Sequence, residues 1–160
     1  MEGGRGKKKT LKEIKEDLIH FFKNREEVLL VYLFGSCLRG KFWKNHDVDI
    51  GILVDLEIYH VLDAKKPYGY GAEMIAELIH HLKHPLVDLT LLNKATPLLA
   101  YEVIHGGTLL FSRSEDLRIE FEISSQKRHA DTKHLRDIKR IYSEGRTAKG
   151  LIAYVLLGDH

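Results

Sequence analysis

Two short groups of residues in the first third of the chain have the types and spacing needed to handle a phosphorylated ligand. Gly35 and Ser36 end the apolar run VLLVYLF, and Asp47-Val48-Asp49 follows after ten further residues. A glycine lets a phosphate approach the backbone closely, a serine adds a hydroxyl donor, and a helix that begins there offers unpaired N–H groups. Carboxylates at positions i and i+2 of a strand point the same way and are oxygen ligands that suit Mg²⁺. This spacing predicts a phosphate contact beside a cation site.

A third carboxylate occurs later in a similar setting. Asp88 lies in the segment VDLTLL, where Val87, Leu89 and Leu91 alternate with polar residues, as in a strand with one buried face. If this strand lies beside the strand of Asp47 and Asp49, three carboxylates converge and repel one another unless cations neutralise them. Two metal ions held in this way would suit in-line displacement at a phosphoryl group, with one ion on a triphosphate and one on the attacking hydroxyl.

Each of these signals also has an ordinary structural explanation. A single Asp-x-Asp is common on strands that face solvent, and a single Gly-Ser is often no more than a turn. Arg39, Lys41 and Lys44 follow the Gly-Ser pair, and each is either a phosphate contact or a solvated loop charge. The combination favours a site because the two groups and Asp88 agree in element type and in direction. We expect Arg39 to join Gly35 and Ser36 in nucleotide binding.

The elements that position these residues follow from hydrophobic periodicity and capping signals. Thr10 and Glu13 have capping-box spacing, as do Ser112 and Glu115. We expect helices near 11–24, 96–105 and 115–142, and a further helix that contains Met74 and ends near Lys83. Strands are expected at 28–34, at 47–55, just past Pro85 and at 108–111. A helix and turn should span 37–46, and a loop should span 65–71. This order predicts an α/β (α+β) fold, with a small mixed sheet flanked by helices.

Length and composition limit the class of protein. The 160 residues suit one domain, with a flexible basic N-terminus at 1–10, a core domain at 11–112 and a C-terminal helical extension at 113–160 that packs on the domain or on a partner. The net charge of +2 makes no strong case for nucleic-acid binding. No apolar stretch reaches the length of a membrane span, no signal peptide is visible, and the single Cys37 suits a reducing compartment. These features favour a cytoplasmic protein.

The Gly35-Ser36 and Asp47-x-Asp49 segment resembles the signature of the DNA polymerase beta nucleotidyltransferase superfamily. The resemblance runs from LFGS through DVDI and VDLTLLN to LLAYEVIHGGTLLF, about residues 11–112, and is greatest to its minimal nucleotidyltransferase (MNT) group. It implies a polymerase beta-like fold, nucleotide binding by Gly35 and Ser36, and two Mg²⁺ held by the catalytic Asp47, Asp49 and Asp88. His46 departs from the small polar residue that often precedes the first aspartate.

The same resemblance implies a function. MntA-type members of the MNT group act as antitoxins that transfer AMP from ATP to a tyrosine of a partner HEPN-domain ribonuclease toxin. For the present chain, this leaves both a homo- and a hetero-oligomer open. One alternative is a small-molecule nucleotidyltransferase of the aminoglycoside kind, although such enzymes usually carry an additional helical domain. Another is an antitoxin that inhibits its toxin by covering it, without catalysis.

Several other features allow more than one interpretation. His80, His81 and His84 cluster at a helix end, and the i, i+4 pair His80 and His84 could bind zinc. Because no third well-placed ligand is evident, a charged, solvated helix end explains the cluster better. Cys37 is interpreted as a packing residue, and so are Phe42 and Trp43, which could otherwise stack on a base. The last predicted helix has apolar ends and a polar middle, which indicates either a helix that is partly packed and partly exposed to solvent or a partner-binding surface. The terminal LIAYVLLG either docks back on the core or covers another chain.

Overall fold

The computed structural model describes residues 9–39 and 46–145. Most of the predicted basic N-terminus, Lys41, Phe42, Trp43, Lys44 and the terminal LIAYVLLG lie outside this part of the chain. The elements, in chain order, are α1 (Leu11–Lys23), β1 (Val28–Phe34), the short 3-10 helix η1 (Ser36–Leu38), β2 (Val48–Val54), α2 (Leu56–Ala64), α3 (Tyr70–Leu82), β3 (Val87–Leu91), the 3-10 helix η2 (Leu92–Lys94), α4 (Pro97–Gly106), β4 (Thr108–Ser112) and α5 (Glu115–Gly145). Among the helices that the structure describes, none combines the length and the apolarity that a membrane crossing requires.

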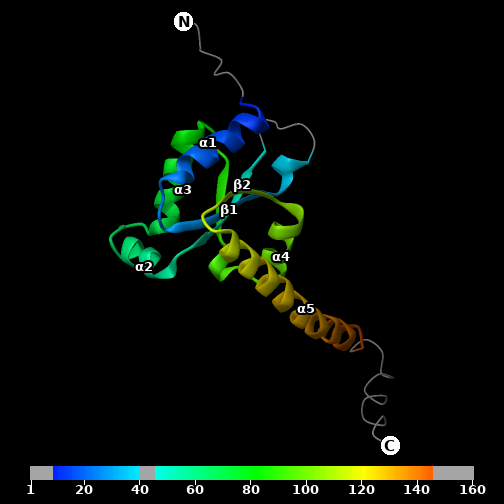
Figure 1. Ribbon diagram of the computed structural model, residues 1–160. Helices are drawn as coiled ribbons and strands as arrows, with labels where there is room; N and C mark the ends of the chain where they lie inside the picture. Colours follow the sequence, from blue (N-terminus) through cyan, green and yellow to red (C-terminus); the bar gives the residue numbers. More distant parts are fainter. Residues whose placement is uncertain (1–8, 40–45, 146–160) are drawn as a thin grey trace, which may run out of the picture.

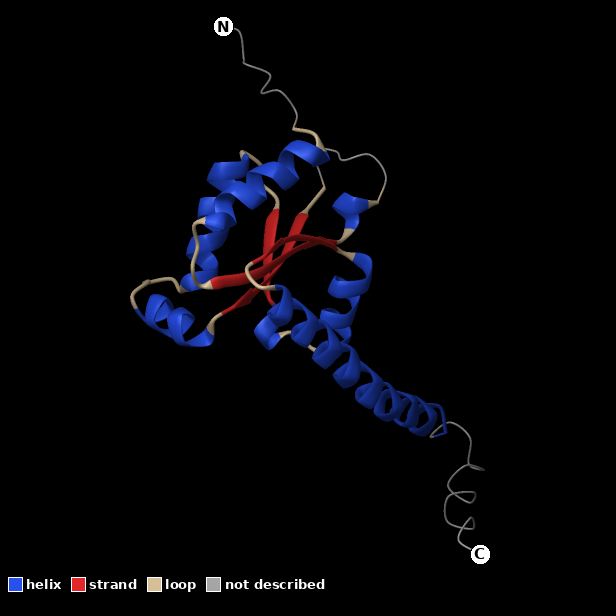
Figure 2. Ribbon diagram, viewed as in Figure 1, coloured by secondary structure: helices blue, strands red, loops and turns tan. Residues whose placement is uncertain are grey.

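The centre of the fold is a four-stranded mixed sheet, drawn in red in Figure 2, with the strand order β3-β2-β1-β4. β1 pairs antiparallel with both β2 and β4, whereas β2 and β3 pair parallel. A parallel pair needs a crossover, and here α2 and α3 supply it. The predicted mixed sheet with flanking helices is confirmed.

Helices cover both faces of the sheet (Figure 1). On one face, α1 and α3 pack against the residues of β1 and β2 that alternate inward, and together they form the larger core cluster, which includes Ile14, Leu18, Phe22, Val31, Val48, Ile50, Ile52, Met74 and Leu78. A capping box at Thr10 begins α1 as predicted, because Glu13 N donates to the Thr10 hydroxyl while Thr10 N donates to the Glu13 carboxylate.

The opposite face is covered by η2, α4 and the first turns of α5. Leu30, Tyr32, Leu92 and Val103 form the buried cluster of this face, and Phe121 of α5 packs against it. Figure 1 shows α5 leaving the body after this contact, and its outer turns expose Leu135 (64%) and Ile141 (50%). The prediction of a last helix that is partly packed and partly exposed is confirmed.

Four details of the sequence-based assignment are wrong. The segment 56–64 forms α2, for which no helix was predicted, and its N-cap is Asp55, assigned above to the preceding strand. The expected loop 65–71 ends early because α3 begins at Tyr70. At the start of α5, Leu117 N donates to the hydroxyl of Ser114 and not to that of Ser112, the predicted cap. The Ser112 hydroxyl instead donates to the Ser114 carbonyl. Directly after Gly35, one 3-10 turn spans Ser36–Leu38, and residues 40–45 of the predicted helix and turn lie outside the described part of the chain.

Candidate active site

The parallel pairing of β2 and β3 brings two of the three predicted carboxylates together. In its register, Asp49 is paired with Asp88, Val48 with Val87 and Ile50 with Leu89. Residues paired in this way project from the same face of a sheet. The expectation that the strand of Asp88 lies beside that of Asp49 is therefore confirmed. Asp47 directly precedes β2 and is near enough for its charge to act on Asp49.

The face of β2 that carries Asp49 changes character within two residues. At Gly51, an added Cβ would lie 3.2 Å from Leu92 Cδ2 and 3.3 Å from Val103 Cγ1, so η2 and α4 close directly over the strand there. Asp49 is half-buried, while Asp47 and Asp88 are exposed. The acids thus occupy the end of the strand face that α4 does not cover.

Gly35 is shaped by its contact with Asp49. It ends β1 with φ +83°, a left-handed conformation that favours glycine, and a Cβ at this position would lie 2.2 Å from Asp49 Oδ2. The contact follows from the sheet, because Phe34 pairs with Asp49 across β1 and β2. The backbone of the Gly-Ser turn and the Asp49 carboxylate are therefore direct neighbours, as a site that joins phosphate and metal binding requires.

The turn after Gly35 differs from the expected helix start. Leu38 N donates to Gly35 O (3.2 Å) and Arg39 N donates to Ser36 O (3.0 Å), which makes a single 3-10 turn. The N–H groups of Ser36 and Cys37 have no acceptor within such a turn, so they are the donors it can offer an anion. A turn of three residues has little macrodipole, which makes close backbone approach the main contribution of this segment.

The side chains in and next to this turn differ in exposure. Ser36 and Arg39 are both exposed next to this turn. Cys37 is buried and belongs to the larger core cluster, which confirms the interpretation of Cys37 as a packing residue. Its thiol donates to Phe34 O (3.4 Å), and burial raises the pKa of that thiol, so it is an unreactive group.

The electrostatics of the acids agree with their placement. Burial, then the carboxylate of Asp88 and then that of Asp47 raise the pKa of Asp49 above its ordinary value of 3.8. All three causes disfavour the ionised carboxylate in the folded chain. A bound cation would remove most of this penalty.

The donor set fits Mg²⁺ better than a metal enclosed by protein ligands. Within residues 9–39 and 46–145, no group of three or more His, Cys, Asp or Glu side chains is gathered at metal-holding distances. Asp88 Oδ1 instead accepts from Leu89 N (2.9 Å). Mg²⁺ is usually held by one or two carboxylates together with waters and substrate phosphates, so the paired Asp49 and Asp88 next to a phosphate turn would suffice.

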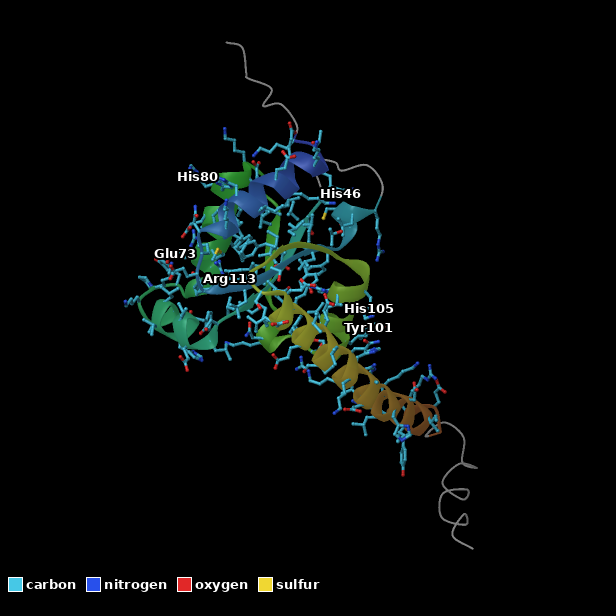
Figure 3. All side chains as sticks on the ribbon, in the orientation of Figure 1. His46, Glu73, His80, Tyr101, His105 and Arg113 are labelled. Carbon is cyan, nitrogen blue, oxygen red and sulfur yellow. The ribbon has the colours of Figure 1, made fainter. Side chains whose placement is uncertain are left out.

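The sequence analysis missed one residue beside the acids. His84 was interpreted as part of a solvated helix end, yet its side chain is buried, and its Nε2 lies 2.8 Å from the carbonyl oxygen of His46. His46 precedes Asp47 directly and is labelled in Figure 3. Because the partner is a backbone carbonyl 38 residues away, no motif in the sequence signals this contact.

The other two histidines of that group lie elsewhere on α3. His81 is half-buried, with its Nε2 3.2 Å from Asp17 O on α1, and its ring stacks on His20. His80 is exposed near the end of the same helix (Figure 3). The interpretation as a solvated helix end therefore holds for His80 and is wrong for His84.

Comparisons with known proteins agree with this geometry. The family model of the polymerase beta nucleotidyltransferase domain matches residues 16–116. No curated protein matches the chain. The matched segment runs from α1 to the start of α5 and contains Gly35, Ser36 and all three acids.

Toxin–antitoxin structures are among the solved structures that share this fold. A toxin–antitoxin structure with AMP-PNP is 23% identical, with a TM-score of 0.61, over 84% of this chain and 98% of the other. The complex of a tri-AMPylated HEPN toxin from Shewanella oneidensis with an MNT antitoxin is 21% identical, with a TM-score of 0.55, over 84% of this chain and 97% of the other. A further structure from Shewanella oneidensis is 19% identical, with a TM-score of 0.54, over 86% and 99% of the two chains. At these identities the likeness establishes the fold.

Proposed function

The chain belongs to the polymerase beta nucleotidyltransferase family, and we propose that it is an MNT-type antitoxin that transfers AMP from ATP to a tyrosine hydroxyl of a HEPN ribonuclease toxin. The catalytic part rests on the pairing of Asp49 with Asp88 beside Gly35. Any side chain at position 35 would collide with the Asp49 carboxylate. The partner and the acceptor are supported by the toxin–antitoxin structures that share the fold.

Each site residue has a defined part in this proposal. The backbone at Gly35 and Ser36 and the side chain of Arg39 bind the triphosphate of ATP, and Asp47, Asp49 and Asp88 hold two Mg²⁺. Bound Mg²⁺ supplies positive charge to the triphosphate and lowers the pKa of the attacking hydroxyl. The acceptor oxygen then forms a bond to the α-phosphorus, the bond from that phosphorus to the bridging oxygen breaks, and pyrophosphate leaves.

Asp88 is the acid best placed to face the acceptor. It is exposed on β3, which is an edge strand of the sheet, whereas Asp49 lies deeper, against Gly35. We assign to Asp88 the orientation of the acceptor hydroxyl and the uptake of its proton, in addition to metal binding. This role needs an acceptor that reaches the open edge of the sheet, and a tyrosine on a protein surface meets that need. Transfer of this kind would take place in the cytoplasm.

The decisive experiment uses the full chain, the protein encoded beside it, Mg²⁺ and ATP labelled at the α-phosphate. We expect label on the neighbour protein, loss of label when EDTA is added, and loss of label in Asp47→Asn. Asp116→Asn is the matched control, because Asp116 is an exposed acid in the first turn of α5. Label on an aminoglycoside and not on the protein would support a small-molecule enzyme. If Asp47→Asn still neutralised the toxin fully, catalysis would not be the mechanism of inhibition.

A further inference from the structure

We infer that His84 is a positioning residue that fixes the backbone of Asp47, and through it the metal site. The inference rests on the proposed function, because it concerns the same acids. It starts from a difference between them: Asp49 and Asp88 lie inside paired strands, whereas Asp47 lies before the first residue of β2. Strand pairing alone therefore does not hold Asp47 in place.

Two hydrogen bonds from one short segment bracket Asp47. On its N-terminal side, His84 Nε2 is 2.8 Å from His46 O, and on its C-terminal side Val48 N donates to Leu86 O over 2.8 Å. Since a carbonyl oxygen can only accept, His84 must carry a proton on Nε2 and donate it. The peptide groups on both sides of Asp47 are thus bound to residues 84–86.

The environment of His84 makes this donor rigid. The side chain is 6% exposed, and the residue follows Lys83, which ends α3 in the left-handed conformation (φ 53°). The segment that contains His84 leads directly into β3 and Asp88. His84 therefore sets the position of Asp47 relative to the strand that carries another acid of the site. Mutation of a residue that orients a metal ligand without contacting the metal typically lowers metal affinity or activity by about 10–100-fold.

The test is titration of the nucleotide-free full chain with Mn²⁺, with the free ion measured by electron paramagnetic resonance. His84→Phe retains a planar ring without a donor and is expected to weaken Mn²⁺ binding ~10-fold. His84→Gln retains an N–H donor and is expected to keep most of the affinity. In an Asp47→Asn background, His84→Phe should cause no further loss, since its effect passes through Asp47.

His81→Phe is the matched control. His81 makes the same kind of contact, from Nε2 to a backbone carbonyl, but on α1 and away from the acids. Equal Mn²⁺ affinity in His84→Phe and His81→Phe, or failure of His84→Gln to restore binding, would overturn the inference. If the Phe variant does not fold, His84→Leu replaces it; if neither folds while His84→Gln does, the residue is purely structural and the inference is wrong.

The two levels of proposal fail in different ways. A wild-type chain that binds no Mn²⁺ would remove the metal basis of the proposed function. A wild-type chain that binds Mn²⁺ without any effect of His84→Phe would remove only the positioning role. Binding that depends on His84, in a chain that labels no protein, would leave the positioning role intact and contradict the proposed acceptor.

Discussion

One face of β2 serves two purposes at positions only two residues apart. At Gly51 it is closed by Leu92 and Val103, whereas at Asp49 it is open to the Gly35 turn and to Asp88. Both places depend on a glycine, but for different reasons. Gly51 makes room for the packing of α4, and Gly35 makes room for a carboxylate. The covered end of β2 thus stabilises the sheet, while the open end retains electrostatic repulsion that a ligand can relieve.

The largest expected effect is at the open end. Asp49→Asn should lower the transfer rate ~10³-fold, because a metal contribution of several kcal/mol is lost. The same variant should be more stable than wild type in metal-free buffer, since an amide neither ionises nor repels Asp88. Transfer assays and chemical unfolding measure the two effects, and a loss of both activity and stability would contradict the comparison.

The pH dependence of that stability has a definite sign. The folded chain holds the Asp49 proton more tightly than the unfolded chain does, because the pKa of Asp49 is raised above 3.8 by burial and by Asp88 and Asp47. The resulting stability is fully present below the unfolded pKa and is lost as pH rises through the folded pKa. Without metal, wild type should therefore lose stability relative to Asp49→Asn over this range.

The next effect separates the two glycines. Gly35→Ala should lower the transfer rate ~10²-fold, because the new methyl group pushes the Asp49 carboxylate out of position, and a displacement of about 1 Å can cost this much in rate. Alanine at the backbone angles of Gly35 (φ 83°, ψ −159°) would also strain the folded state by about 1–3 kcal/mol. The assay is transfer per folded molecule, with folding checked by circular dichroism. Activity at the wild-type level would show that the Asp49 carboxylate can take another position without loss.

Gly51→Ala should have a smaller effect, on stability alone. The methyl group would meet Leu92 and Val103 at 3.2–3.3 Å, and overpacking of this kind costs typically 1–3 kcal/mol. Lower entropy of the unfolded chain offsets about 0.4–1 kcal/mol, which leaves a net loss of about 1 kcal/mol. Thermal unfolding should show a decrease in Tm of about 2–4 °C, with transfer per folded molecule unchanged. A fall in transfer would mean that the two ends of β2 are coupled.

The smallest expected effect is at the contact between α4 and α5. Tyr101 of α4 lies between the rings of His105 and His129, with centroids 3.9 Å away on each side, and Figure 3 labels Tyr101 and His105 next to α5. Loss of solvent around the ring, followed by the nearby Arg136 and Lys133, lowers the pKa of His129. The stability that neutral His129 contributes is therefore fully present above the unfolded pKa of about 6.5 and is lost as pH falls through the lower folded pKa.

His129→Phe keeps an aromatic ring in the stack and removes the titration. We expect the Tm of this variant to fall less than that of wild type between pH 7 and pH 5. The difference between the two falls should be smaller than the decrease in Tm caused by Gly51→Ala. Transfer by the folded protein should not change, because the stack lies on the covered side. The same pH profile for both proteins would show that His129 does not titrate in this contact.

The sequence predicted the elements whose pattern is local. The alternation around Val48 and Ile50 identified both the buried face of β2 and the direction of Asp49, and the Thr10 capping box placed the start of α1. Helix α2 was missed because its apolar residues do not follow its buried face: Leu56 and Val61 are exposed. Its N-cap, Asp55, also continues the alternation of the preceding strand and was assigned to it.

The site was predictable to the extent that its residues share a motif. Asp47, Asp49 and Asp88 could be placed on the non-core faces of their strands from periodicity, although the adjacency of Asp49 and Asp88 depended on a strand order that only the structure shows. The buried contact of His84 with the His46 backbone could not be inferred, because a carbonyl group is present at every residue. The same limit explains why the contact between Gly35 and Asp49 appeared only in three dimensions.

The parallel arrangement of β2 and β3 also has a consequence for the order of folding. β1 and β2 follow each other in the chain as antiparallel neighbours, but Asp88 joins Asp49 only after the whole crossover that contains α2 and α3 has closed. Such non-local pairing is intrinsically slow, because the entropy of closing the loop must be overcome before the contacts form. A partly folded chain could thus contain the Gly-Ser turn and two acids and still lack the third. Catalytic competence would then be acquired late in folding, and ATP with Mg²⁺ would select the completed fold over its precursors.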